Sequence, residues 1–450
     1  MRQNLLKSMG LALGGIALIL LATTTTALAV PSFARQTGMS CNACHIVWPE
    51  LTPFGRHFKL TGYTMSKSNK PYQMPPPIAG LVQLSFTHTD KSVPFGSRPF
   101  QSQGNDNVGI PQEMSLYYAG KIYDKLGAFS QGTYDGLSNK FLLDMTDIRY
   151  ANTFKVGGKP LICGLTVNNS PTIEDVWNST PAYGFPFASS SVAPTPAAGA
   201  IIDGGLDQQV GGVGLYAYFN NLVYAGVTFY TTARKGYTQW LGGGTVTDTM
   251  VDGVVPYWRV FLQHQWKKHS LMVGHYGLVT HIFPEGQSRG NSDRFTDIAF
   301  DAQYQYISRK HRFSLATTWI HEIQDWNASY ALGNTANQSD HLDTFKINFN
   351  YSYRSAYGIF GGNWAYFNTS GSKDALLYAP DPVDGSRNGH PDSSGFIIQG
   401  IYVPPKWEQA KIVVQYTIYD NFNGSSTNYD GSRRNASGNN TLYVLTWLMF

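Results

Sequence analysis

From about residue 78 onward, apolar and polar side chains alternate along the chain with a period of two. In the segment 297–306, Ile298 and Phe300 lie on one face, whereas Asp301 and Gln303 lie on the other. This alternation predicts β-strands with one apolar, aromatic face and one polar face. About sixteen segments follow the pattern, at 78–88, 112–123, 126–134, 142–152, 159–168, 209–219, 222–231, 255–266, 269–280, 296–307, 311–321, 343–353, 356–367, 395–403, 410–419 and 440–450.

The connections between these segments decide between a soluble sandwich and a membrane barrel. Very short turns, such as 124–125 and 220–221, alternate with long loops rich in Gly, Ser, Pro and Asn, such as 169–208 and 368–394. Short turns on one side and long loops on the other are typical of outer-membrane barrels, whose short turns are periplasmic. We therefore predict an all-β fold in which residues 78–450 form an antiparallel outer-membrane β-barrel of about 16 strands. Both ends of the barrel would be periplasmic, and the long loops extracellular.

Two of the predicted strands stand out. The last one ends in Leu448 and Phe450, which share an apolar face with Val444, as expected of the strand that closes a barrel. The segment 142–152 is the least regular, because Asp144 and Asp147 fall on opposite faces. The alternation therefore predicts the location of this strand better than its orientation.

Composition narrows the class of protein. Charged residues make up 14% of the chain and aromatic residues another 14%, against an average near 25% charged. A formal net charge of +4 without a run of Lys and Arg gives no reason to expect a nucleic-acid partner. After residue 29 no apolar run approaches the roughly 18 residues of a spanning helix. A membrane barrel in contact with outer-membrane lipid is favoured over a soluble all-β fold.

The first 29 residues resemble an export signal. Arg2 and Lys7 precede an apolar run at 11–21, and Ala27 and Ala29 provide the small residues of a cleavage site. A membrane anchor is the alternative, but the apolar run is shorter than the roughly 20 residues that span a bilayer. We expect residues 1–29 to be a signal peptide.

The sequence CNACH places Cys41, Cys44 and His45 at the spacing that attaches a c-type haem. The two thiols add to the haem vinyl groups, and the histidine becomes the proximal ligand of the iron. A zinc site is the alternative, but it would need four ligands, and no second cysteine pair lies nearby. We predict one covalently bound haem c. Cys163, the third cysteine, is expected to pack as a small apolar residue in a strand.

A short helix is predicted after the motif. Thr52 and Pro53 form a helix N-cap and first turn, and Gly62 follows the predicted end at about residue 61. Helical spacing would place Phe54, His57 and Phe58 on one face, where they could cover the haem.

The distal ligand of the haem stays open between several residues. His57 is one candidate, and Met65 and Met74 are two others, since a thioether ligand raises the reduction potential. A barrel residue such as His88 is not excluded.

Residues 30–77 form a segment too short to enclose a haem alone, because chains of roughly 40 to 60 residues rarely bury enough surface. The lumen of a sixteen-strand barrel is wide and polar, and comparable barrels can be plugged by an internal segment. We therefore expect this monohaem cytochrome c segment to plug the lumen from the periplasmic end.

The stretch from Phe33 to Tyr63, FARQTGMSCNACH followed by PELTPFGRHFKLTGY, resembles the haem segment of fused outer-membrane monohaem cytochrome-porins of iron-oxidising bacteria. The resemblance implies an iron:cytochrome c oxidoreductase that oxidises extracellular Fe(II). The electron would pass through the single haem to a periplasmic c-type cytochrome or blue copper protein. Cys41, Cys44 and His45 match the family's haem attachment and axial ligand, whereas no loop carries a recognisable iron-ligand motif, so catalytic residues stay unknown.

Two other functions are compatible with the same features. The chain could be a porin or transport barrel whose haem segment gates or senses. It could also conduct electrons from a different extracellular donor.

Overall fold

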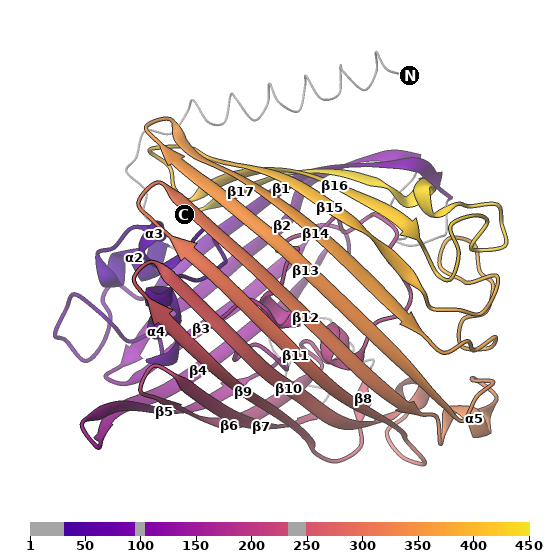
Figure 1. Ribbon diagram of the computed structural model, residues 1–450, viewed down its shortest axis with the longest axis horizontal. Coiled ribbons are helices and arrows are strands. Elements are labelled where there is room, and N and C mark those ends of the chain that lie inside the picture. The colour runs from indigo at the N-terminus through magenta and orange to yellow at the C-terminus, as the bar shows by residue number, and fades with distance from the viewer. Residues whose placement is uncertain (1–30, 95–103, 233–248) are drawn as a thin grey trace.

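The computed structural model describes residues 31–94, 104–232 and 249–450, in which the strands form one closed antiparallel barrel (Figure 1). The predicted signal peptide, residues 1–29, lies outside these ranges. Apart from the two-residue β8, each strand pairs with the next one along the chain, so that β7 pairs with β9, and β1 pairs with β17 to close the barrel. The strands are β1 (Ile78–Val93), β2 (Gly104–Tyr123), β3 (Leu126–Asp135), β4 (Lys140–Val156), β5 (Lys159–Asn168), β6 (Val210–Phe219), β7 (Val223–Thr232), β8 (Met250–Val251), β9 (Val255–Trp266), β10 (His269–Phe283), β11 (Asp293–Ile307), β12 (His311–Asp325), β13 (Ser339–Ser355), β14 (Gly358–Gly371), β15 (Ser393–Val403), β16 (Ala410–Asn421) and β17 (Thr441–Met449).

The number of strands agrees with the prediction. β8 has only two residues and pairs with the same strand, β10, that also pairs with β9. β8 is therefore an interrupted start of β9, and the barrel has 16 strands. Each of the sixteen predicted segments overlaps one of these strands.

The two faces of the wall are those that the alternation predicts. On β11, Asp297, Asp301 and Gln305 are buried toward the lumen, whereas Phe300 points outward and is 51% exposed. On β13, Phe345 is likewise exposed on the outside. A polar interior and an apolar exterior reverse the arrangement of a soluble protein and are typical of a membrane-spanning barrel.

The two ends of the barrel differ in their connections. Very short turns join the strands at one end, where Figure 1 also shows α2 (Pro31–Thr37), α3 (Cys41–Cys44) and α4 (Pro53–Leu60). The long loops lie toward the opposite end. They contain α5 (Ser329–Leu332) and the 3₁₀ elements η4 (Pro284–Gly286) and η5 (Ala436–Asn439). β1 begins and β17 ends at the short-turn end, which is the periplasmic side of an outer-membrane barrel. None of the helices in the described ranges is long and apolar enough to cross a membrane.

One long loop, residues 169–209 between β5 and β6, folds into the barrel. It contains the 3₁₀ turn η1 (Pro181–Tyr183) and the π-helical turn η2 (Ile201–Gly205). Its Asp175 carboxylate lies 3.0 Å from the Arg259 guanidinium, which also binds Asp301 at 2.7 Å. Since all three side chains are buried, these ion pairs hold the loop against the inner wall.

A β-bulge explains the least regular predicted strand. The register between β3 and β4 shifts between Ser130 and Gly132, where β4 contributes one extra residue. A bulge changes which side chains point inward. Asp144, on one side of it, bonds the lumen residue Thr133, and Asp147, on the other, is fully buried. Both carboxylates therefore face the lumen although their sequence spacing suggests opposite faces.

Candidate functional site

The predicted haem-attachment residues lie together at the short-turn end of the barrel. Cys41 and Cys44 begin and end the single turn α3, and the backbone N–H of His45 donates to the Cys41 carbonyl at 2.9 Å. Neither cysteine forms a disulfide. Burial raises the pKa of the Cys41 thiol, near the Glu408 carboxylate, to about 12, and that of Cys44 to about 11. Both thiols are therefore protonated at neutral pH.

The His45 ring is oriented by a backbone contact. Its Nδ1 lies 3.0 Å from the carbonyl oxygen of Pro49. Because a carbonyl only accepts hydrogen bonds, Nδ1 carries the proton and Nε2 keeps its lone pair. Burial lowers the pKa of His45 to about 4, so the ring is neutral at neutral pH. A neutral imidazole whose other nitrogen is held by a carbonyl is the form that binds a metal through Nε2.

The predicted helix after the motif is α4, and its N-cap is confirmed. The Thr52 hydroxyl accepts a hydrogen bond from the Gly55 backbone N–H at 3.2 Å. The helix turns Phe58 toward the cavity beside the cysteines, whereas Phe54 and His57 do not line it. The prediction of one covering face therefore holds only for Phe58.

Gly55 allows α4 to lie close against α3. A Cβ atom at this position would meet the Cys44 carbonyl oxygen at 2.2 Å, far inside van der Waals contact. The helix can pack on α3 only because Gly55 has no side chain.

We expect Gly55→Ala to separate α4 from α3 and to lower the stability of the helical segment that contains them by about 1–3 kcal/mol. The measurements are the ratio of haem to protein after purification and the midpoint of thermal unfolding. Gly199→Ala is the control, since no atom lies within 4 Å of a Cβ there. Equal haem content and equal midpoints in both variants would contradict the proposed packing.

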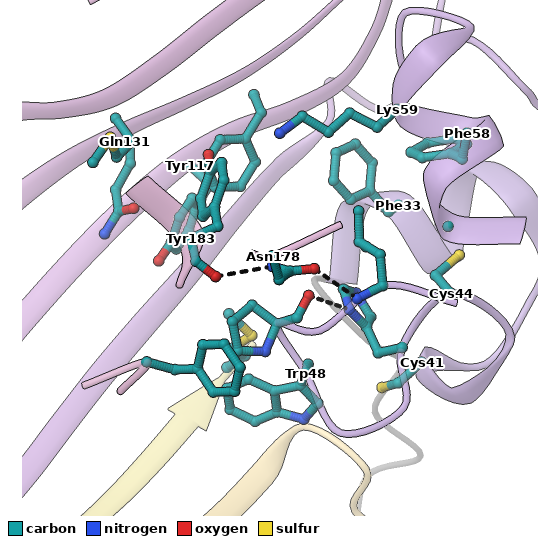
Figure 2. A pocket seen from close by; sticks show the side chains of 18 of the residues that line it. Phe33, Cys41, Cys44, Trp48, Phe58, Lys59, Tyr117, Gln131, Asn178 and Tyr183 are labelled. Carbon is teal, nitrogen blue, oxygen red and sulfur yellow. Dashed lines mark hydrogen bonds between the residues drawn. The ribbon is translucent and has the colours of Figure 1, made fainter. Parts of the chain in front are cut away.

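A cavity of about 340 Å³ opens beside Cys41, Cys44 and His45 (Figure 2). Its walls come from the helical segment, from the inward loop 169–209 and from strands β1 to β4 and β17. Nine aromatic side chains contribute to the lining: Phe33, Trp48, Phe58, Tyr63, Tyr117, Phe129, Tyr183, Phe187 and Trp447. Such a lining suits a flat, largely apolar macrocycle.

Unpaired polar atoms in this cavity allow a test of whether a haem fits. Both side-chain polar atoms of Gln409 and the indole Nε1 of Trp447 are buried, and none has a hydrogen-bond partner among the described residues. Leaving such atoms unpaired costs about 1–3 kcal/mol each. The Gln409 and Trp447 donors are covered by protein atoms, so the carboxylates of a haem could accept from them only after these side chains turn toward the cavity. The cysteine pair, the oriented histidine and the aromatic walls agree with the same group.

The N-terminal helical segment, residues 31–77, is tied to the barrel wall through buried side chains. Arg56 donates to Gln305 Oε1 at 2.6 Å, and Asn350 donates to Glu50 Oε2 at 2.7 Å. The Tyr63 hydroxyl donates to Asp147 at 2.6 Å. These wall residues come from β11, β13 and β4. The segment is therefore bonded to strands on several sides of the lumen.

The same segment also contacts the inward loop. The Lys59 ammonium donates to the carbonyls of Ile173 and Asp175 at 2.6 and 2.8 Å. The backbone N–H of Leu51 donates to Asn178 Oδ1 at 3.0 Å (Figure 2). Burial lowers the pKa of Lys59 to about 7. Segment and loop thus pack against each other in the periplasmic half of the lumen, beside the cavity that both of them line.

The predicted distal ligands lie elsewhere. Met74 is 65% exposed, Met65 is half-buried, and His57 is exposed. His88 pairs with Asp106 on neighbouring strands, 2.7 Å away. None of these four residues lines the cavity. Three methionines that do line it, Met39, Met145 and Met449, were not singled out by the sequence. Only the folded barrel brings Met145 and Met449 to the cysteines, whereas Met39 lies two residues before Cys41.

A second cavity of about 240 Å³ lies next to the first. Glu113 and Asp144 line both of them. The second cavity also contacts Asp135 and Leu142, which flank the β3–β4 hairpin on the long-loop side. The two cavities together therefore extend from the periplasmic end toward the extracellular end. In the described part of the chain, no group of three or more His, Cys, Asp or Glu side chains is arranged to hold a metal ion.

Comparison with known proteins gives matches among solved structures only. No family model and no curated protein matches the chain. OmpT of Vibrio cholerae in its trimer form is similar with a TM-score of 0.45 and 9% identity, covering 83% of this chain and 98% of OmpT. An anion-selective porin from Comamonas acidovorans has the same TM-score at 11% identity and covers the same shares. Salmonella typhi OmpF, solved with daunomycin, has a TM-score of 0.42 and 13% identity, covering 83% and 97%.

Proposed function

We propose that this chain is an outer-membrane c-type cytochrome that oxidises extracellular Fe(II) and passes the electron through a single haem to a periplasmic carrier. One observation carries the proposal: the CNACH motif lines an aromatic cavity inside a membrane-spanning barrel. The choice of Fe(II) as the donor comes from the resemblance of residues 33–63 to cytochrome-porins of iron-oxidising bacteria.

The residues around the cavity have distinct roles in this function. Cys41 and Cys44 would hold the haem, and His45 would bind its iron through Nε2. When bound, the haem supplies a one-electron redox centre. Pro49 fixes the histidine ring through its carbonyl. The rings of Phe33 and Phe58 pack edge to face, with their centroids 5.0 Å apart, and help to exclude water. A dry, rigid site lowers the reorganisation energy of electron transfer, because few surrounding dipoles must turn when the charge of the redox centre changes.

The position of the cavities supports a path across the membrane. The first cavity lies at the periplasmic end, where a soluble carrier can approach. The second, toward the extracellular side, is lined by Glu113, Asp135 and Asp144. Asp135, at the outer end of this passage, is a carboxylate whose charge would favour the approach of a divalent cation.

The test is the absorbance of the haem in the purified full-length protein. We expect anaerobic addition of excess Fe(II), at the working pH of the organism, to convert the oxidised spectrum to the reduced one. A chemical reductant, added to a matched sample, gives the full amplitude as control. If the chemical reductant reduces the haem but Fe(II) does not, iron oxidation is excluded. The proposal of a different extracellular donor would then remain.

A porin or transport barrel with a gating or sensing haem plug is the second candidate function. The closed 16-strand wall with a polar lumen favours it, because barrels of this size commonly form aqueous channels. The packed segment and loop inside the lumen disfavour an open channel. Conductance measurements distinguish the two functions.

A further inference from the structure

The periplasmic rim of the barrel has a charge pattern of its own. Its short turns and the haem segment carry nine exposed cationic side chains: Lys67, Lys70, Lys155, Lys159, Lys267, Lys268, Arg309, Lys310 and Lys406. We call these nine residues the basic rim. On the same turns and segment, the described acidic residues outside the lumen are Asp124 and Glu408, and Glu408 accepts a hydrogen bond from Asn42.

The opposite end of the barrel has mixed charge. Exposed acids there include Asp252, Glu285 and Asp420, and exposed bases include Lys140 and Lys373. The small net charge of +4 for the whole chain therefore hides a periplasmic face of nearly one sign.

One part of the basic rim, at Lys67, lies next to the cavity beside the cysteines. Met39 lines the cavity and is 41% exposed, two residues before Cys41. Lys67 is held close to it, because its backbone N–H donates to the Gln36 carbonyl at 3.0 Å and its side chain reaches Gly38. A molecule docked on these lysines would approach the cavity at its periplasmic opening.

We propose that the basic rim docks an acidic face of a soluble periplasmic redox protein. This inference rests on the proposed function, because it describes the carrier that would take the electron. A single exposed ion pair contributes at most about 1 kcal/mol, but many charges of one sign steer an oppositely charged partner and raise its association rate by about 10- to 1,000-fold. The attraction falls with salt, since the Debye length is about 8 Å at physiological ionic strength.

Lipid phosphates are the competing partner for the turn residues, which lie near the membrane surface. Lys67 and Lys70 favour a protein, because they belong to the N-terminal segment, whose Lys70 carbonyl accepts a hydrogen bond from the buried Lys121 ammonium at 2.9 Å. The experiment must therefore separate the two partners.

The probe is a soluble, lysine-rich cytochrome c, used unmodified and after succinylation, which replaces lysine cations with carboxylates. The haem-loaded full-length protein is placed in zwitterionic lipid nanodiscs, and binding is measured at rising salt. We expect the succinylated form to bind at low salt and the unmodified form not to bind. Lys67→Glu/Lys70→Glu and, separately, Lys268→Glu/Lys310→Glu should weaken binding about tenfold. The control Lys140→Glu/Lys373→Glu, at the other end, should leave it unchanged.

Equal binding of the two cytochrome forms, or unchanged binding in both rim variants, would overturn the proposal. The proposal would also be overturned if the rim variants changed only the amount of anionic phospholipid that the protein retains. That result would identify the rim as a lipid contact. Binding is measured without iron. If Fe(II) does not reduce the haem, the protein can still bind the acidic probe. Failure of the proposed function is therefore distinguishable from failure of the docking proposal.

Discussion

Replacing Cys41 and Cys44 together with alanine is expected to remove all covalently bound haem while the barrel still folds. The haem c assignment requires two thioether bonds, and these two residues are the cysteines that line the cavity. The strand ladder closes through β1 and β17 without them. Haem staining after denaturing electrophoresis measures the loss, and circular dichroism measures the strand content.

Cys163→Ala provides the matched control. Cys163 lies on β5 and does not line the cavity, so this variant should keep its full haem content. Haem that survives in the double variant, or disappears in the control, would refute covalent attachment at CNACH. A double variant without haem should also lose the spectral response to Fe(II).

Deleting residues 31–70 is expected to convert a nearly closed barrel into a conducting pore. In the full chain, this segment and the inward loop pack against each other in the periplasmic half of the lumen. Without the segment, the loop remains tied to the wall through Asp175 and Arg259, so the pore should be constricted but open. Single-channel conductance in planar bilayers measures the difference, which should be several-fold or more.

The full-length chain with both Cys41 and Cys44 replaced by alanine is the control for this experiment. The contacts of Arg56 with Gln305 and of Lys59 with Ile173 do not involve the haem. Hydrogen bonds of charged groups contribute about 1.5–3 kcal/mol each, so the segment should stay seated and the conductance low. A full-length protein that conducts as well as the deletion variant would indicate that the segment does not block the lumen.

Much of the barrel could be predicted from the sequence because period-two alternation is a local signal. The prediction is weakest where strands extend into the extracellular loops. β2 begins at Gly104, whereas the alternation indicates a start near 112. Asn107 and Gly109 carry little apolar signal, but they pair with Thr87 and Ser85 of β1. Tertiary pairing thus decides structure that local patterning does not indicate.

The candidate site was predictable only in part. CNACH is a spacing motif within five residues, and Thr52 is a local cap, so both could be recognised along the chain. The cavity walls depend on residues far apart in sequence, such as Met145 and Met449. The inward course of loop 169–209 depends on Asp175 meeting Arg259 across the lumen. Neither feature leaves a periodic signal.

The pairing of β17 with β1 has a consequence for biogenesis. Trp447 and Met449, which belong to β17, form part of the cavity wall, and β17 reaches its place only when it pairs with the first strand. The cavity is therefore incomplete on every partly assembled intermediate that lacks this strand. A haem attached to Cys41 and Cys44 would therefore be enclosed on this side only once β17 has paired with β1.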